Sequence, residues 1–352
     1  MITLLAATGY TGQFVAAELH KHHLSFRIAG RSEDRLQKLA ASLEPSPEII
    51  VCDIEKPETL GKAFDGANII LNCAGPFTDL GEPVVREAAR RGIHYIDTTG
   101  EQNFIKLVFE KCGKEAAEKG AALVPAAAYD YAFGDAAAEI VSRGLDPCDE
   151  ISIAYNIAGF NTSRGTKKSM LRAVSQQGFL FLDGHVVPSK SGDIKRELEF
   201  PDGRRLSGVS FPGGEVIQVP PHVRAKNVIT FMAVSATVAG VIGTASAIGG
   251  AVRKGASDAI IDRLHRDSLG PDETHRLATK FVIRCEARKG DQRKVLFITG
   301  CDPYGITAVS VVALAERLAK EPPQSVGAVS PSMLYGADFI REYTTAAGLQ
   351  WT

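Results

Sequence analysis

The first twelve residues carry the most specific chemical pattern of the chain. A short apolar run, Met1–Leu5, leads into Ala6-Ala-Thr-Gly-Tyr-Thr-Gly12, and residues 13–19 have the pattern of a helix. A strand, a glycine turn and a helix in this order hold the pyrophosphate of a dinucleotide on the N–H groups of the helix. We therefore predict that a dinucleotide contacts Ala7, Thr8, Gly9, Tyr10, Thr11 and Gly12.

The two glycines have separate tasks, and the first glycine of the usual fingerprint is missing. Gly9 lets the backbone approach the phosphates, and Gly12 lets the helix pack close to its strand. Ala7 occupies the missing position in a G-x-G-x-x-G register, and Ala6 occupies it in a G-x-x-G-x-x-G register. An alanine fits there if its φ stays below zero. A tight turn that binds no ligand is the alternative interpretation.

The end of the second predicted strand, Phe26–Gly30, decides which dinucleotide binds. NAD enzymes usually place an Asp or Glu there, whereas this chain has Arg31 and Ser32. A guanidinium forks onto a 2′-phosphate, and a hydroxyl adds one more hydrogen bond. We therefore predict NADP rather than NAD. Alternatively, Arg31 pairs with one of the two acidic residues that follow Ser32.

The ends of the next two strands supply the remaining predicted cofactor contacts. Asp53 ends the strand 49–53, where the adenine edge lies in folds of this type, or else it caps the helix entered at Pro57. The buried strand 68–73 ends in a turn whose glycine leaves room for the ribose on the nicotinamide side. The residues predicted to contact the cofactor in this turn are Cys73, Ala74, Gly75, Pro76 and Phe77.

These sites require strands that alternate with helices. Six such strands up to residue 125 predict an α/β fold with a Rossmann-type doubly wound parallel sheet, whose ligands lie at the carboxyl ends of the strands. Later, two hairpin patterns around turns at 201–203 and 288–291 predict a second α+β domain with an antiparallel sheet. We assign 1–130 to the first domain, with 305–352 returning to it, and 131–304 to a substrate and dimerisation domain.

Several short motifs together resemble one known family. They are Ala-Thr-Gly9-Tyr-Thr-Gly12, Ala29-Gly-Arg-Ser32, Cys52-Asp53, Asn72-Cys-Ala-Gly-Pro-Phe77, Gly81-Glu-Pro-Val-Val85 and His94-Tyr-Ile-Asp-Thr-Thr-Gly-Glu101. The chain resembles the saccharopine dehydrogenase-like NADP-binding proteins, which include trans-acting enoyl reductases. The resemblance is dense over 1–135, is loose beyond it and returns at 302–308 and 327–331. It implies a Rossmann domain, a second α+β domain and a reductase role. Ala6 departs from the family, which usually has glycine there.

The segment after the sixth strand contains the catalytic candidates Tyr129, Asp130 and Tyr131. The resemblance implies that this segment faces the nicotinamide, where a phenol or carboxyl group would supply the proton that completes a reduction. In the alternative interpretation, Asp135 caps the helix 136–142 and the tyrosines pack with their hydroxyls at the surface.

Composition limits the classes of function. The apolar fraction of 45% and charged fraction of 23% are ordinary for a globular protein. Six cysteines without a C-x-x-C pair fit a reducing compartment, and the first strand begins at residue 2, so we expect a cytoplasmic protein without a signal peptide. The histidine spacing predicts no metal site. The net charge of −1 and irregularly placed basic residues argue against nucleic-acid binding.

Charge and hydropathy indicate what else the second domain contacts. Residues 151–300 have 22 Lys and Arg against 13 Asp and Glu, which fits an anionic substrate, an anionic lipid surface or an acidic face of the protein itself. Val228–Val252 has no charged residue. We interpret it first as a buried helix, and otherwise as an acyl-chain lining or a peripheral membrane contact. The predicted antiparallel sheet favours a homodimer.

Two functional hypotheses follow. In the first, the chain is an NADPH-dependent oxidoreductase that passes hydride to a C=N or C=C bond of a small-molecule substrate, an imine or an enoyl compound. In the second, it is a non-catalytic NADP-binding sensor or accessory protein that docks a partner enzyme. The sparse catalytic constellation and the basic second domain favour the second hypothesis.

Overall fold

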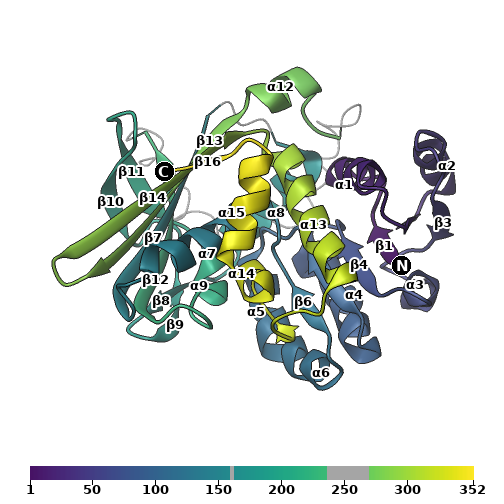
Figure 1. Ribbon diagram of the computed structural model, residues 1–352, viewed down its shortest axis with the longest axis horizontal. Helices are drawn as coiled ribbons and strands as arrows, with labels where there is room; N and C mark the ends of the chain where they lie inside the picture. The colour runs from purple at the N-terminus through teal and green to yellow at the C-terminus, as the bar shows by residue number, and fades with distance from the viewer. Residues whose placement is uncertain (159–161, 236–268) are drawn as a thin grey trace. The chain divides into compact units, whose positions relative to one another are not determined.

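The computed structural model describes residues 1–158, 162–235 and 269–352 and divides into two compact units (Figure 1). Unit 1 comprises Met1–Thr99, Phe104–Tyr129 and Tyr304–Gly336. Unit 2 comprises Gly100–Asn103, Asp130–Pro303 and Ala337–Thr352. The sequence analysis assigns all of 305–352 to the first domain, whereas the structure places Ala337–Thr352 in the second unit.

The sheet of unit 1 is seven-stranded and parallel, in the order β15-β6-β5-β4-β1-β2-β3. Its strand bounds are β1 Ile2–Leu5, β2 Phe26–Gly30, β3 Glu48–Val51, β4 Ile69–Asn72, β5 His94–Asp97, β6 Ala122–Val124 and β15 Gly327–Ala328. β1 lies between β2 and β4, so the strand order reverses there and creates the topological switch point at which dinucleotides bind. The predicted doubly wound sheet is confirmed.

Helices cover this sheet, and the central strands β1 and β4 are buried along their whole length. This burial explains their continuous apolar runs, since parallel strands covered on both faces need no polar alternation. The helical bounds are α1 Tyr10–Lys21, α2 Glu33–Ala41, α3 Pro57–Phe64, α4 Phe77–Arg91, α5 Gln102–Leu107, the π-helical turn Val108–Cys112, α6 Gly113–Glu118, α13 Pro303–Lys320 and α14 Pro331–Tyr335.

Helix α4 begins at Phe77, six residues before Pro83, which the sequence pattern favours as a first-turn residue. The helix starts early because Phe77 is buried and packs against Phe104, with the ring centroids 5.7 Å apart. Pro83 then lies inside the helix but on its exposed face, where water can satisfy the carbonyl that has lost its N–H partner.

The main sheet of unit 2 has the order β10-β11-β12-β7-β13-β14-β16. The strand bounds are β7 Cys148–Ala158, β8 Gly178–Leu182, β9 His185–Ser189, β10 Lys195–Glu199, β11 Arg205–Ser210, β12 Ala225–Val234, β13 Lys280–Lys289, β14 Gln292–Cys301 and β16 Gln350–Trp351. The predicted hairpins β10–β11 and β13–β14 are confirmed. However, β12 pairs with β7 in parallel, so the sheet is mixed rather than purely antiparallel.

Two contacts explain why the end of the chain belongs to unit 2. Strand β16 pairs with β14 in antiparallel register, Trp351 opposite Ile298. The N–H of Ala337, at the start of α15 Ala337–Ala346, donates to Glu139 on α7 Tyr129–Ser142. The other helices of unit 2 are α8 Arg164–Ser175, α9 Glu215–Gln218 and α12 Glu273–Ala278.

Helix α7 begins at Tyr129, so the interpretation of Asp135 as an N-cap is wrong. Asp135 lies inside the helix, is fully buried and contacts His222 at 2.6 Å between Oδ1 and Nε2. Burial alone would lower the pKa of His222, but the Asp135 carboxylate outweighs burial and the pKa is raised. A partner for Asp135 far away in the sequence explains why a local capping pattern misplaced this helix.

The uncharged stretch Val228–Val252 begins as strand β12 and not as a helix, because Val228–Met232 continues the pairing with β7 and the strand runs on to Val234. The rest of this stretch, and the predicted surface helix 257–265, lie outside the described residues. Within the described ranges, no helix combines the length and the apolar character needed to span a bilayer.

Candidate dinucleotide site

The glycine turn after β1 has the geometry of a phosphate cradle. The N–H of Gly9 donates to the carbonyl oxygen of Ala6 at 2.9 Å, which closes the turn. A Cβ added at Gly12 would overlap that carbonyl oxygen and lie 2.9 Å from Cα of Ala7, and a Cβ at Gly9 would lie 3.1 Å from the same oxygen. Position 12 therefore requires glycine for the close approach of helix to strand, as predicted, whereas a side chain at position 9 would make a tight contact with the turn.

Ala6 has a φ of +56°, so the expectation that the turn alanine keeps φ below zero is wrong. Ala7 has no positive φ, which identifies Ala6-x-x-Gly9-x-x-Gly12 as the register of the fingerprint. The left-handed conformation costs an alanine roughly 1–2 kcal/mol that a glycine avoids. The family glycine is therefore missing at a position whose backbone still has the glycine conformation.

We expect Ala6→Gly to stabilise the protein by about 0.5–1 kcal/mol, because relief of the left-handed strain exceeds the extra entropy that glycine has in the unfolded chain. Equilibrium unfolding in urea measures the change. NADPH affinity should stay within a factor of two or so, since the turn already has the glycine geometry. A destabilised A6G variant would show that the turn is not strained.

The N-terminus of α1 is open to an anion. Its N-cap is Gly9, no described side chain caps it, and its first turn has no acidic residue. The first N–H groups of a helix lack partners within the helix, and the helix dipole places partial positive charge there. This end of α1 therefore fits a pyrophosphate, the group that the sequence pattern predicts.

Aromatic side chains border the cradle. The Tyr10 ring packs edge-on against Phe14 and against Tyr304, with centroid distances of 5.1 and 4.8 Å. Tyr304 is in the first turn of α13, almost 300 residues along the chain, and is missed by the sequence analysis of the site. Thr307, from the same helix, accepts a hydrogen bond from the N–H of Tyr129 at 3.2 Å. The start of α13 thus belongs to the site in unit 1.

Two arginines lie where the adenosine ribose of a dinucleotide binds in this fold. Arg31 is 71% exposed and pairs with Glu55 at 3.3 Å, not with Glu33 or Asp34. Arg35, in the first turn of α2, donates from Nη2 to the carbonyl oxygen of Thr8 at 2.6 Å. Arg35 is not among the residues predicted to contact the cofactor, because nothing local in the sequence links it to the glycine turn.

Ser32 precedes α2 as its N-cap, and its hydroxyl makes no capping hydrogen bond. Asp53 forms a local turn instead of capping α3: its Oδ1 accepts from the N–H of Glu55 at 3.1 Å, and the N-cap of α3 is Lys56. Asp53 and Glu55 thus form one acidic turn beside Arg31. An exposed pair such as Arg31–Glu55 is weak, so a phosphate can compete for the guanidinium.

We expect Arg35→Ala to weaken NADPH binding by roughly 10–100-fold and NADH binding by less than about threefold, because each hydrogen bond to a charged group contributes about 1.5–3 kcal/mol. Glu55→Gln should bind NADPH as tightly as or more tightly than wild type, because it frees Arg31. Fluorescence titration of both dinucleotides measures this. Equal losses for NADPH and NADH in R35A would mean that Arg35 only supports the glycine turn.

The residues of the turn after β4 differ in how far they are buried. Ala74 and Phe77 are buried, so their contribution to a ligand is limited to the backbone, whereas Cys73 is half-buried. Burial raises the pKa of the Cys73 thiol to about 12, so it is neutral at physiological pH. The Cys73 N–H donates to the carbonyl oxygen of Leu5, which ties this turn to the end of β1 beside the cradle.

A buried polar ladder shapes the neighbouring strand ends. Asn72 donates to the hydroxyl of Tyr95 at 3.1 Å, and its Oδ1 accepts from the N–H of Ala74. Asp97 accepts from the N–H groups of Thr99 and Ala126, both at 2.9 Å. The loops after β4, β5 and β6 are therefore fixed by side chains at the carboxyl ends of the strands.

The three catalytic candidates occupy the first turn of α7, and the structure gives them different surroundings. Tyr129, in unit 1, is buried. Asp130 and Tyr131 are in unit 2, where the Tyr131 hydroxyl donates to the carbonyl oxygen of Gly100 at 3.2 Å and its N–H donates to Asp130. Burial raises the pKa of Asp130 to about 6, which is a value suited to proton exchange near neutral pH.

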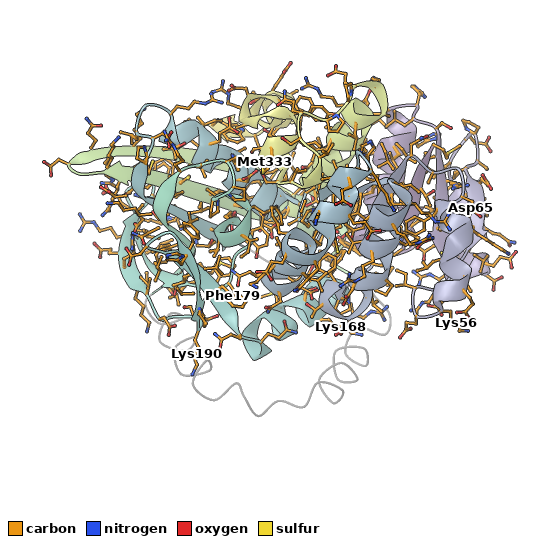
Figure 2. All side chains as sticks on the ribbon, turned by 90° about the horizontal axis from the view of Figure 1, so that it is seen from below. Lys56, Asp65, Lys168, Phe179, Lys190 and Met333 are labelled. Carbon is orange, nitrogen blue, oxygen red and sulfur yellow. The ribbon has the colours of Figure 1, made fainter. Side chains whose placement is uncertain are left out.

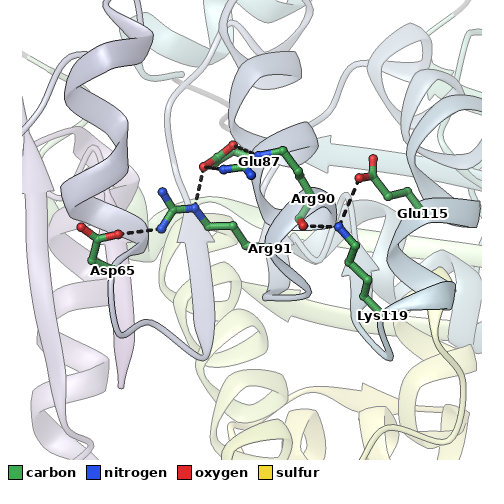
Figure 3. Close-up of polar contacts among 6 residues, drawn as sticks. All are labelled: Asp65, Glu87, Arg90, Arg91, Glu115 and Lys119. Atoms are coloured by element: carbon green, nitrogen blue, oxygen red, sulfur yellow. Dashed lines mark hydrogen bonds and ion pairs between the residues drawn. The ribbon is translucent and has the colours of Figure 1, made fainter.

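A surface depression of unit 1 lies at the amino ends of strands β4 and β5, away from the glycine turn. It has a volume of about 590 Å³ and is lined by Phe64, Asp65, Gly66, Ala67, Arg90, Arg91 and Ile93. Asp65, at the surface in Figure 2, pairs with Arg91 at 2.6 Å, and Glu87 bonds Arg90 and Arg91 (Figure 3). These hydrogen bonds, the one to Arg90 first, lower the pKa of Glu87 to about 2. The arginines are already paired, so this depression is a poor anion site.

Within the described residues, no group of three or more His, Cys, Asp or Glu side chains is placed to hold a metal ion. All six cysteines are free, and four of them are buried.

Comparison with known proteins supports the assignment of the first unit. Residues 2–130 match the saccharopine dehydrogenase NADP-binding domain. A saccharopine dehydrogenase-like oxidoreductase of Bos taurus is 32% identical over 146 residues, 37% of this chain and 34% of that protein. A trans-acting enoyl reductase of Mycobacterium leprae is 37% identical over 139 residues, 38% of this chain and 33% of that protein. The matches span about a third of the length of these curated relatives.

The fold extends the resemblance over the whole chain. The solved structure of apo saccharopine dehydrogenase (L-Glu forming) from Saccharomyces cerevisiae superimposes with a TM-score of 0.66 and covers 100% of this chain and 99% of its own. At 12% identity this likeness shows the fold alone. Because residues 2–130 also match in sequence, the predicted resemblance of this region to the saccharopine dehydrogenase NADP-binding domain is confirmed, and the whole chain has the fold of that solved structure.

Proposed function

We propose that this chain is an NADPH-dependent oxidoreductase that transfers hydride to a C=N or C=C bond of an imine or enoyl substrate. The observation that carries the proposal is the open N-terminus of α1 over the Gly9 and Gly12 cradle, with Arg35 bonded to Thr8 beside it. A bound nicotinamide supplies the hydride. The residues of this chain hold the pyrophosphate and the 2′-phosphate and handle the proton.

The preference for NADP rests on charge. Two guanidinium groups, those of Arg31 and Arg35, lie near the end of β2. The Ser32 hydroxyl makes no capping hydrogen bond and adds one donor. An NAD enzyme usually has a carboxylate at this place. The NADP-binding domain matched over residues 2–130 supports the same choice.

Asp130 is the proposed proton donor. With a pKa of about 6, Asp130 is protonated in roughly one molecule in ten at pH 7. After it has donated its proton, the carboxylate takes up another one from water. The proton would complete the reduction after hydride transfer. Tyr131 is less suited to this step because its hydroxyl is already bonded to Gly100. Tyr129 stays a second candidate.

The consumption of NADPH in the presence of a cyclic imine or an enoyl thioester tests this function. The wild-type protein should oxidise NADPH with one of these two substrate classes. Asp130→Asn should lower kcat about 100-fold or more and leave the affinity for NADPH unchanged. Asp202→Asn, in the exposed β10–β11 turn, is the matched control and should behave as wild type. NADPH binding without oxidation of either class would favour the non-catalytic accessory protein.

The remaining expectations are proposals of the same kind. We propose an anionic or acyl small-molecule substrate, a homodimer in solution, a cytoplasmic location and a peripheral contact with the membrane. The net positive charge of residues 151–300 supports the anionic substrate.

A further inference from the structure

A carboxyl group is buried in the interior of unit 2, and no cationic side chain among the described residues forms an ion pair with it. Glu215, the first residue of α9, is fully buried. Its Oε2 accepts from the Thr230 hydroxyl on β12 at 3.1 Å, and its Oε1 is bonded to the Tyr155 hydroxyl on β7. Both partners are neutral, so an ionised Glu215 would be an uncompensated charge in the interior.

The hydrogen bonds of Tyr155 limit where the proton of Glu215 can be. The Tyr155 hydroxyl also lies 2.8 Å from the backbone carbonyl oxygen of Asp130, which can only accept. A hydroxyl has one proton, so when Tyr155 donates it to Asp130, the proton between Tyr155 and Glu215 comes from Glu215. In this arrangement the chain of donors runs from Thr230 to Glu215, from Glu215 to Tyr155 and from Tyr155 to Asp130. If Tyr155 instead donates to Glu215, the Asp130 carbonyl oxygen loses this hydrogen bond.

Gly134 shows that this arrangement is built into the fold. Gly134 lies inside α7, where glycine costs about 1 kcal/mol relative to alanine. A Cβ at this position would overlap both the Tyr155 hydroxyl and the Glu215 carboxyl group. The glycine allows the phenol and the carboxyl group to lie directly against the helix whose first turn contains Asp130.

We propose that Glu215, as a neutral carboxylic acid, is a positioning residue that fixes the first turn of α7 and thereby the carboxyl group of Asp130 through Tyr155. The proposal rests on the proposed function for the role of Asp130 and is independent of it for the proton on Glu215. Burial, which raises the pKa of Glu215 to about 8, agrees with the neutral form. The titratable groups that influence Glu215 are Tyr155, Asp130 and, on β13, Cys285.

Carboxyl NMR of protein labelled with ¹³C-aspartate tests the positioning directly, because it follows the titration of Asp130 without any substrate. The signal is assigned with Asp130→Asn. Wild type should titrate near pH 6. Glu215→Gln keeps a neutral donor toward Tyr155 and an acceptor for Thr230. The midpoint of the Asp130 titration in this variant should therefore stay within about 0.3 pH units of the wild-type midpoint.

Tyr155→Phe and Glu215→Leu remove the connection, and in both the Asp130 midpoint should fall by a unit or more toward the ordinary value for Asp. If Y155F does not fold, E215L gives the same comparison. An unchanged midpoint in Y155F and E215L would overturn the positioning role. If the midpoint of the Asp130 titration shifts as much in E215Q as in Y155F, the claim that Glu215 is a neutral acid is wrong. A failure to oxidise NADPH would overturn the proposed function and leave these titrations interpretable.

Discussion

Gly12→Ala should abolish detectable NADPH binding and lower the stability of the protein by about 1–3 kcal/mol. The added methyl group would overlap the Ala6 carbonyl oxygen and lie 2.9 Å from Cα of Ala7, so α1 must move away from β1. This movement removes the first N–H groups of α1 from the pyrophosphate position. The loss of one or two charge-assisted hydrogen bonds weakens binding by about 100-fold or more.

Gly61→Ala is the matched control for this variant. Gly61 is also a helical glycine of unit 1, but its nearest neighbour to an added Cβ is Nη2 of Arg91 at 3.7 Å, an ordinary contact. We expect G61A to be as stable as wild type or more stable by up to about 1 kcal/mol, with unchanged NADPH affinity. Isothermal titration and urea unfolding measure both. If G12A binds NADPH as tightly as G61A does, the turn of Gly9 and Gly12 does not hold the pyrophosphate.

The largest expected pH effect on stability comes from Glu215. Its pKa is about 8 in the folded protein and about 4.5 in the unfolded chain, so folding favours the protonated form. The stabilisation is fully present below pH 4.5 and is lost as pH rises to 8, at up to about 1.4 kcal/mol per pH unit. Glu215→Gln removes this dependence, and its stability relative to wild type should increase steadily from pH 5 to pH 8.

The difference between the two proteins isolates Glu215 from other groups that titrate in the same range, notably Asp130 with a pKa of about 6. Urea unfolding at four pH values gives the difference directly. Glu110→Gln, which replaces an exposed carboxylate paired with Lys106, is the control and should keep a constant offset from wild type. Parallel curves for wild type and E215Q would show that Glu215 is ionised in the folded protein.

The sequence allowed the prediction of those features that depend on local pattern. Strands β1 and β4 were recognisable because burial on both faces requires continuous apolar runs, and the glycine turn because its close contacts exclude other residues. The same reasoning failed at Ala6. An alanine normally avoids a positive φ, and only the structure shows that the turn imposes one.

Residues that meet from distant parts of the chain escaped the sequence analysis. Tyr304 reaches Tyr10 from the opposite end of the chain, and Glu215 lies 60 positions from Tyr155. Tyr155 continues an alternating strand pattern and gives no sign of a polar partner. Gly134 was the one available signal, since a glycine inside a helix calls for a packing reason. Arg35 also escaped, because its hydrogen bond to the Thr8 carbonyl oxygen forms only once α2 lies beside the glycine turn.

We expect the first unit to bind NADPH and to prefer it to NADH. Thermal unfolding of the purified protein with NADPH, with NADH and with neither tests it most directly. A ligand at about 100 times its dissociation constant stabilises the folded state by about 2.7 kcal/mol, which raises Tm by about 2–4 °C for 150–250 residues and by less for a longer chain. We expect a rise in Tm with NADPH and a clearly smaller rise with NADH at equal concentration. No rise with either dinucleotide, or equal rises with both, would contradict it.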